Sequence, residues 1–153
     1  MSLDRIEYVY TFGMDDDEIV EELETNDVGI LSLASDGVAY AVPVSFHHDE
    51  SSLYLRLTSD GASKKLSYVD DTAEACFSLY AVESSRKSWS IVATGPIHEL
   101  SAAEQEQFDE ATINEQFSEL RIFDEEIDTV EWTIYELEME ELTGRKTGGS
   151  VIQ

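Results

Sequence analysis

The sequence contains little cysteine and no long apolar run. Cys76 is the single cysteine among 153 residues, so no disulfide can form within the chain. No apolar run approaches the roughly 20 residues that a membrane-spanning helix needs. The first residues also lack the charged-then-apolar layout of a secretory signal. From these absences we expect a soluble, cytoplasmic protein.

Positive charge is scarce as well. The chain has 34 acidic against 9 basic side chains, a formal net charge of -25. Such a charge repels itself in dilute buffer, whereas molar salt shortens the Debye length to about 3 Å and screens the repulsion. The composition is typical of a halophilic protein; an acidic interaction protein is the alternative, although the acid is not gathered in a tail. Either interpretation disfavours nucleic acid and membranes as partners.

The apolar pattern predicts one mainly β domain over residues 1–153. Acidic residues from Asp15 to Glu18 mark a helix start, and that helix should end near Asn26. Hairpin turns and alternation predict strands, and two further helices should start near residue 62 and at Ser101. The fold class is therefore mainly β (α+β), a six-stranded antiparallel barrel that is closed or partly closed (split), with flanking short helices. The tail, 143–153, is Gly-rich and expected to be flexible. The six predicted strands are 29–34, 38–46, 53–58, 73–81, 88–98 and 131–142.

The few basic residues are clustered. Five of the nine lie between positions 56 and 87: Arg56, Lys64, Lys65, Arg86 and Lys87. Between them, the segment 58–65 combines a strand end, a glycine, hydroxyl groups and a helix start. Helix amino-terminal N–H groups and ammonium groups both favour a phosphate. The alternative is a solubilising helix with an ordinary start, and no GxxxxGK[ST] phosphate loop is present.

The sequence gives little support for a metal site or a catalytic side chain. His47 and His48 are adjacent on a strand, so their side chains point to opposite faces. His98 is expected to be a surface residue at a strand end. The sequence therefore predicts no metal site, and with no GxSxG motif it identifies no catalytic side chain. Trp89 and Trp132 read by default as core or interface aromatics.

The order of several short segments carries a family resemblance. The pieces are 29–34, Asp36-Gly37, 41–46, 53–56 and 61–65, followed by 88–95 with a V-x-x-G ending. Together they resemble the pyridoxamine 5′-phosphate oxidase-like family of FMN-binding split β-barrels, which includes nitroimidazole-resistance-type flavoproteins. The resemblance extends over residues 15–142, and its specificity comes from order and spacing.

The resemblance implies a homodimer with two FMN sites, each built from both subunits. It also implies a flavin-dependent oxidoreductase acting on a small molecule. The alternatives are a non-catalytic flavin-binding or redox-sensing module and a cofactor-free acidic interaction protein, and relatives of the fold also bind haem, deazaflavins or B6 compounds. An Arg-x-His-like segment for pyridoxal phosphate is missing, so vitamin B6 oxidation is not predicted. The implied cofactor-binding residues are Arg56, Thr58, Ser63, Lys64 and Lys65 at the phosphate, Pro43, Val44 and Ser45 behind the isoalloxazine ring, and Trp89 and Ser90 near the cofactor.

Overall fold

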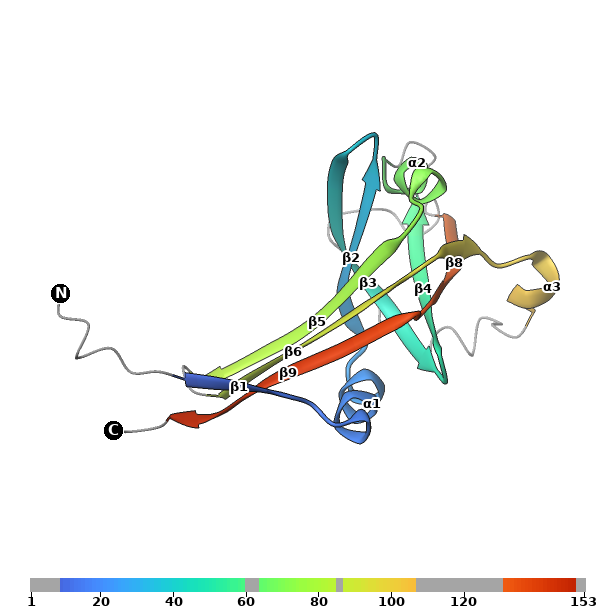
Figure 1. The fold of residues 1–153 in the computed structure, drawn as a ribbon. Helices are drawn as coiled ribbons and strands as arrows, with labels where there is room; N and C mark the ends of the chain where they lie inside the picture. The colour runs from blue at the N-terminus through green and yellow to red at the C-terminus, as the bar shows by residue number, and fades with distance from the viewer. Residues whose placement is uncertain (1–8, 60–63, 85–86, 107–130, 151–153) are drawn as a thin grey trace.

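A computed structural model describes residues 9–59, 64–84, 87–106 and 131–150 (Figure 1). The strands of this part form one antiparallel sheet in the order β1-β9-β6-β5-β2-β3-β4-β8-β7. Its helices are α1 (Asp16–Thr25), α2 (Lys64–Asp71) and α3 (Ala102–Gln105). The strands are β1 (Val9–Gly13), β2 (Val28–Ser35), β3 (Val38–Asp49), β4 (Ser52–Ser59), β5 (Ala75–Ser84), β6 (Lys87–Gly95), β7 (Ile97–Glu99), β8 (Glu131–Glu138) and β9 (Glu141–Ser150).

Local signals define α1 and α3. The Glu18 carboxylate accepts a hydrogen bond from the Asp15 N–H at 3.2 Å, which satisfies a donor at the start of α1. At α3, Ser101 Oγ accepts from the Glu104 N–H, while the Glu104 carboxylate accepts from the Ser101 N–H. The predicted capping box at Ser101 is thus confirmed. The continuation of that helix predicted beyond residue 106 lies outside the described residues.

The hairpin between β2 and β3 also follows from its sequence. Asp36 and Gly37 both have positive φ, 51° and 76°. Two successive residues with positive φ make the type I′ geometry that suits the twist of a two-residue hairpin, and Asp-Gly is a favoured pair there. The turn sets the register in which Ser35 faces Val38.

The core lies inside the curved sheet. Alternate residues of β2, β3, β4 and β5 are buried there, and the rings of Phe46 and Phe77 meet edge to face with centroids 4.8 Å apart. On the helix α1, Ile19 and Leu23 are buried against this core. A second small cluster joins Leu100 and Ile134, with Tyr54 packed against them.

The antiparallel, barrel-like fold is confirmed, but the strand count differs. The described residues form nine strands in a linear order, where the sequence predicts six. The predicted strand 88–98 divides into β6 and β7 at Gly95-Pro96, and 131–142 divides into β8 and β9 at Met139-Glu140. Strand β1 was not predicted. The flexible tail predicted from residue 143 is wrong up to residue 150, because β9 pairs with both β6 and β1.

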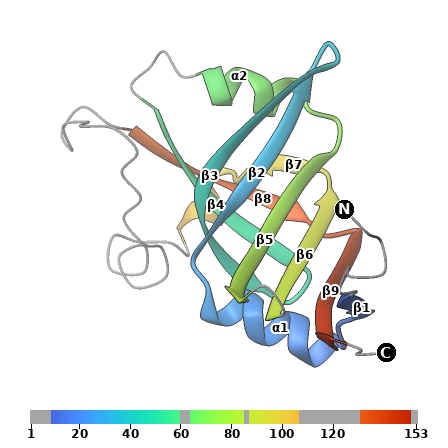
Figure 2. The ribbon, with the colours of Figure 1, turned by 90° about the vertical axis from the view of Figure 1, so that its left-hand side faces the viewer.

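The two longer helices lie at opposite ends of the sheet (Figure 2). Strands β5, β6, β9 and β1 extend together as an arm away from β3 and β4 (Figure 1). Helix α2 is fastened to the end of β2, where Thr72 Oγ1 accepts a hydrogen bond from the Ala34 N–H and Ser35 Oγ donates to Asp71. None of the described helices is both long and apolar enough to cross a membrane.

Candidate functional site

Ser45 and Arg56 lie side by side on neighbouring strands. They are register partners of β3 and β4, so their side chains share one face of the sheet. Ser45 is buried and Arg56 half-buried. Because side chains alternate along a strand, Pro43 belongs to the same face. We call these residues, with Thr58 two positions beyond Arg56 on β4, the β3–β4 group: Pro43, Ser45, Arg56 and Thr58. Val44 points to the other face and belongs to the core.

Strand β4, which carries two residues of the β3–β4 group, precedes helix α2 in the chain. Lys64 and Lys65 are the first two residues of this helix, five residues beyond the last residue of β4. Its first N–H groups have no partner within the helix and favour an anion. Packing of the Tyr40 ring against the Tyr68 ring, at 5.3 Å between centroids, fixes α2 over β3. Ser63 lies outside the described residues.

Trp89 and Ser90 lie elsewhere on the sheet. On β6, Ser90 faces Tyr80 of β5 and Arg145 of β9, while Trp89 faces Ala81 and Lys146. Strands β5 and β2 stand between β6 and β3. With about 4.8 Å between neighbouring strands, roughly 14 Å of sheet separates β6 from β3. In the strand order of one chain, Trp89 and Ser90 are therefore not neighbours of the β3–β4 group.

The sequence prediction missed two basic residues beside Trp89 and Ser90. Arg145 and Lys146 belong to β9, and Lys146 Nζ makes a 2.6 Å ion pair with Glu18 Oε2 of α1. The sequence predicts both residues to lie in the flexible tail that begins at residue 143. Their retention in a chain with so few basic residues was a signal that could have drawn attention to them.

The positive charge beside the β3–β4 group comes more from Arg56 than from His47. His47 lies two residues beyond Ser45 and therefore on the same face. Burial lowers the pKa of the His47 imidazole, while the Asp49 carboxylate acts in the opposite direction. At neutral pH His47 is therefore uncharged, and the guanidinium supplies the positive charge on this stretch of β3 and β4.

A family model matches most of the chain. The sequence model of the family described as Pyridoxamine 5′-phosphate oxidase matches residues 15–146. The chain belongs to this family. The matched range contains Ser45, Arg56, Trp89 and Ser90, and it also reaches Arg145 and Lys146. No curated protein matches the chain significantly.

Several solved structures share the fold of this family member. A FAD-binding protein from Mesorhizobium loti superposes with a TM-score of 0.72 at 18% identity, over 90% of this chain and 99% of that one. A candidate 5-nitroimidazole antibiotic resistance protein from Bacteroides thetaiotaomicron gives 0.69 at 16% identity, over 97% and 96%. A FAD-binding protein from Mycobacterium smegmatis gives 0.64 at 14% identity, over 89% and 98%. At these identities the likeness concerns the fold.

Proposed function

We propose that this protein binds FMN and acts as a flavin-dependent oxidoreductase on a small molecule. The observation that carries the proposal is the Ser45–Arg56 pair on the strands that lead into α2, in a member of the pyridoxamine 5′-phosphate oxidase family. The proteins from Mesorhizobium loti and Mycobacterium smegmatis with this fold are described as FAD-binding, which supports a flavin as the ligand.

The residue types fit a flavin mononucleotide phosphate. A phosphate monoester carries about -1.5 to -2 charges and three acceptor oxygens. Arg56 offers a fork of N–H donors, which can bind two of those oxygens at once. Lys64, Lys65, Thr58 and Ser63 would add ammonium and hydroxyl donors. Ser45, with Pro43 and Val44, would stand behind the ring, and the bound flavin would supply the electron-transfer chemistry.

We further propose that the complete site forms in a two-fold homodimer. The β3–β4 group is separated in one chain from Trp89 and Ser90. Beside Ser90, the outer face of β5 and β6 exposes large apolar side chains: Tyr80 at 66%, Val82 at 69% and Val92 at 39%. Covering this face with a second copy would remove it from water and bring Ser90, on the strand that also carries Trp89, toward the β3–β4 group of its partner.

A charged substitution on the outer face of β5 and β6 tests whether the homodimer forms there. The parent should show about twice the 17.2 kDa chain mass by light scattering. Val82→Asp should give the monomer and lose flavin, because a buried unpaired carboxylate opposes association. Val38→Asp is the matched control, since Val38 is 55% exposed near the β2–β3 turn. A parent monomer that holds flavin tightly would contradict the shared site.

The phosphate assignment is tested by comparing FMN with riboflavin at one fixed salt concentration. Replacing Lys64 or Lys65 with Ala removes a charge-assisted hydrogen bond of about 1.5–3 kcal/mol, so FMN should bind about 10- to 100-fold more weakly. Riboflavin, which lacks the phosphate, should bind the parent weakly and respond little to the same changes. Lys87→Ala is the control, because the Lys87 side chain is exposed and pairs with Glu83. Equal binding of FMN and riboflavin to the parent would remove the phosphate site.

Two measurements separate the proposed function from its competitors. A purified protein with flavin absorbance excludes a cofactor-free interaction protein, and mass spectrometry of the released ligand identifies the flavin. Oxidation of a reduced nicotinamide nucleotide in the presence of an electron acceptor distinguishes an enzyme from a non-catalytic flavin-binding module. A coloured protein that never turns over would favour that module.

A further inference from the structure

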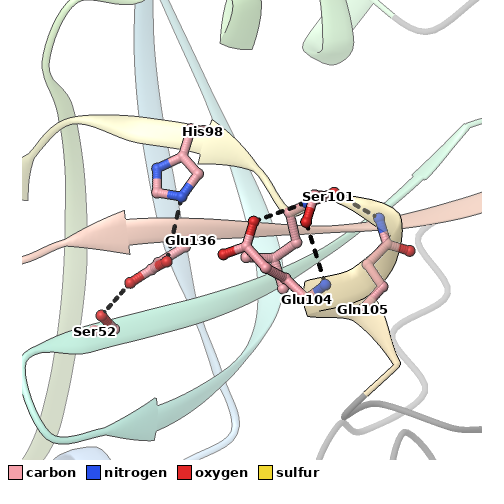
Figure 3. Close-up of polar contacts among 7 residues, drawn as sticks. Ser52, His98, Ser101, Glu104, Gln105 and Glu136 are labelled. Carbon is pink, nitrogen blue, oxygen red and sulfur yellow. Dashed lines mark hydrogen bonds and ion pairs between the residues drawn. The ribbon is translucent and has the colours of Figure 1, made fainter.

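A histidine and two glutamates meet on the side of β4 that faces away from β3. His98 of β7 and Glu136 of β8 are register partners, and His98 Nε2 lies 3.3 Å from Glu136 Oε1. Glu104 of α3 completes the group, and the candidate ligand atoms of the three residues all lie within 4.8 Å of one another. Figure 3 shows the imidazole directed at Glu136 and the Glu104 carboxylate on the same side. The sequence alone predicts only that His98 is a surface residue at a strand end.

Hydrogen bonds to backbone carbonyls hold the segments of these three residues together. The Leu100 N–H donates to the Ile134 carbonyl at 3.0 Å, which continues the pairing of β7 with β8. Gln105 Nε2 donates to the Leu100 carbonyl at 3.0 Å, so the single turn of α3 is fastened back to the strand. These hydrogen bonds hold Glu104 near Glu136, a residue far from it in the sequence, without any ion.

Each carboxylate is also oriented by a neighbouring donor (Figure 3). Ser52 Oγ donates to Glu136 Oε2, so Glu136 Oε1 is the oxygen that faces His98. The Ser101 N–H donates to Glu104 Oε1 at 3.0 Å. Donors of this kind orient metal-binding carboxylates in proteins and raise affinity by fixing the ligand geometry. The arrangement thus has ligands and the partners that position them.

We propose that His98, Glu104 and Glu136 bind a divalent transition-metal ion. Four-coordinate zinc with bonds of about 2.0–2.2 Å needs ligand atoms about 3.4 Å apart. The ligand atoms must then close by at most about 1.4 Å, which side-chain rotation provides because His98 and Glu104 are exposed. The imidazole favours zinc, nickel or copper over magnesium and calcium, which prefer oxygen ligands alone. Two carboxylates match the ion's charge, and water fills the fourth position.

The ion would tie α3 to β8. It would join β7, α3 and β8 at one point, beside the small apolar cluster of Leu100 and Ile134. The inference is independent of the flavin proposal, because none of its three ligands belongs to the β3–β4 group or lies on β6.

The test is a zinc titration of chelator-treated full-length protein by calorimetry, with a competing chelator and fixed KCl. The parent should bind one ion tightly per chain, and excess magnesium should not displace it. His98→Ala and Glu136→Gln should each weaken zinc at least about tenfold, and Ser52→Ala about tenfold through the orientation of Glu136. Glu140→Gln is the matched control, because it removes an exposed acid between β8 and β9 and should leave affinity unchanged.

Cobalt(II) gives a second readout that does not depend on how strongly the acidic surface binds metal ions. A site with one imidazole ligand should produce a visible absorption band in the parent that His98→Ala abolishes while circular dichroism stays unchanged. A parent without a saturable zinc site overturns the proposal. It is likewise overturned if His98→Ala binds zinc as tightly as the parent, or if Glu140→Gln loses as much affinity as Glu136→Gln.

Discussion

At the scale of single residues, the ion pair between Glu18 and Lys146 links α1 to β9. The hydrogen bond from Lys146, aided by the Asp15 N–H, lowers the pKa of the Glu18 carboxyl below its usual value of 4.5. A carboxyl with a depressed pKa in the folded state contributes stability that is complete above its unfolded pKa and is lost as pH falls through the folded value. Lys146→Ala should therefore destabilise the protein at pH 7 but much less at pH 3.

Urea denaturation of parent and Lys146→Ala at both pH values measures this effect. Lys87→Ala is the control, since its partner Glu83 is a neighbour on the surface and exposed pairs contribute little. A loss of stability in Lys146→Ala that is as large at pH 3 as at pH 7 would assign the effect to packing of the lysine stem instead of to the ion pair.

The position of Lys146 could not be predicted from its own neighbourhood. Residues 143–150 are rich in Gly and Thr and have no alternation of apolar residues. They form a strand because β6 lies on one side and β1 on the other, so backbone hydrogen bonds from both neighbours hold them. Pairing between distant segments overrides local propensity here, and sequence alone gives no account of it.

At the scale of elements, Gly95 explains the division between β6 and β7. A Cβ atom at this position would lie 1.7 Å from the Glu138 carbonyl oxygen, which belongs to the backbone of β8 and cannot rotate away. Gly95→Ala should therefore lower the free energy of unfolding by about 3 kcal/mol or more, as strong overpacking does.

Chemical denaturation measures this loss, and Gly13→Ala is the control. Gly13 also lies in a strand, but a Cβ there would meet nothing within 4 Å, so its effect should be small. If Gly95→Ala and Gly13→Ala are equally stable, the close approach of β6 to β8 is not a constraint.

Elements with local signals were predictable, and elements set by contacts between strands were not. The Asp36-Gly37 turn, the acidic start of α1 and the Ser101 capping box all came from residues within a few positions of one another. The bends at Gly95 and Met139 arise where β6 and β8 approach each other, far apart in the sequence. For the same reason, the sequence alone does not show that His98 and Glu136 lie next to each other.

At the scale of the whole molecule, the strand order decides what the candidate site requires. The sequence places Arg56, Ser45 and Trp89 on strands, and the family resemblance implies that these strands lie near a cofactor. It could not tell that β5 and β2 separate Trp89 from Ser45, because that order depends on pairing between remote strands. Because of this separation in the strand order, we propose that residues of two chains together form the flavin site.

The net charge of -25 predicts that stability depends on salt. Raising KCl from 0.1 M to about 1 M shortens the Debye length from about 10 Å to 3 Å and screens repulsion between acidic groups spread over the surface. The melting temperature should then rise by about 10 °C or more, which corresponds to a few kcal/mol for a domain of this size. Differential scanning calorimetry at increasing KCl measures the shift.

A variant with fewer surface acids distinguishes charge screening from other effects of salt. Replacing the exposed residues Glu21, Glu138 and Glu141 with Gln changes the formal net charge by three, from -25 to -22. This variant should melt higher than the parent at 0.1 M KCl and gain less from added salt, because less repulsion remains to be screened. If both proteins gain the same number of degrees, salt acts through hydration of apolar surface. A parent whose melting temperature does not change from dilute buffer to molar KCl would show that its acidic surface imposes no cost on the folded state, and the halophilic interpretation of the composition would be wrong.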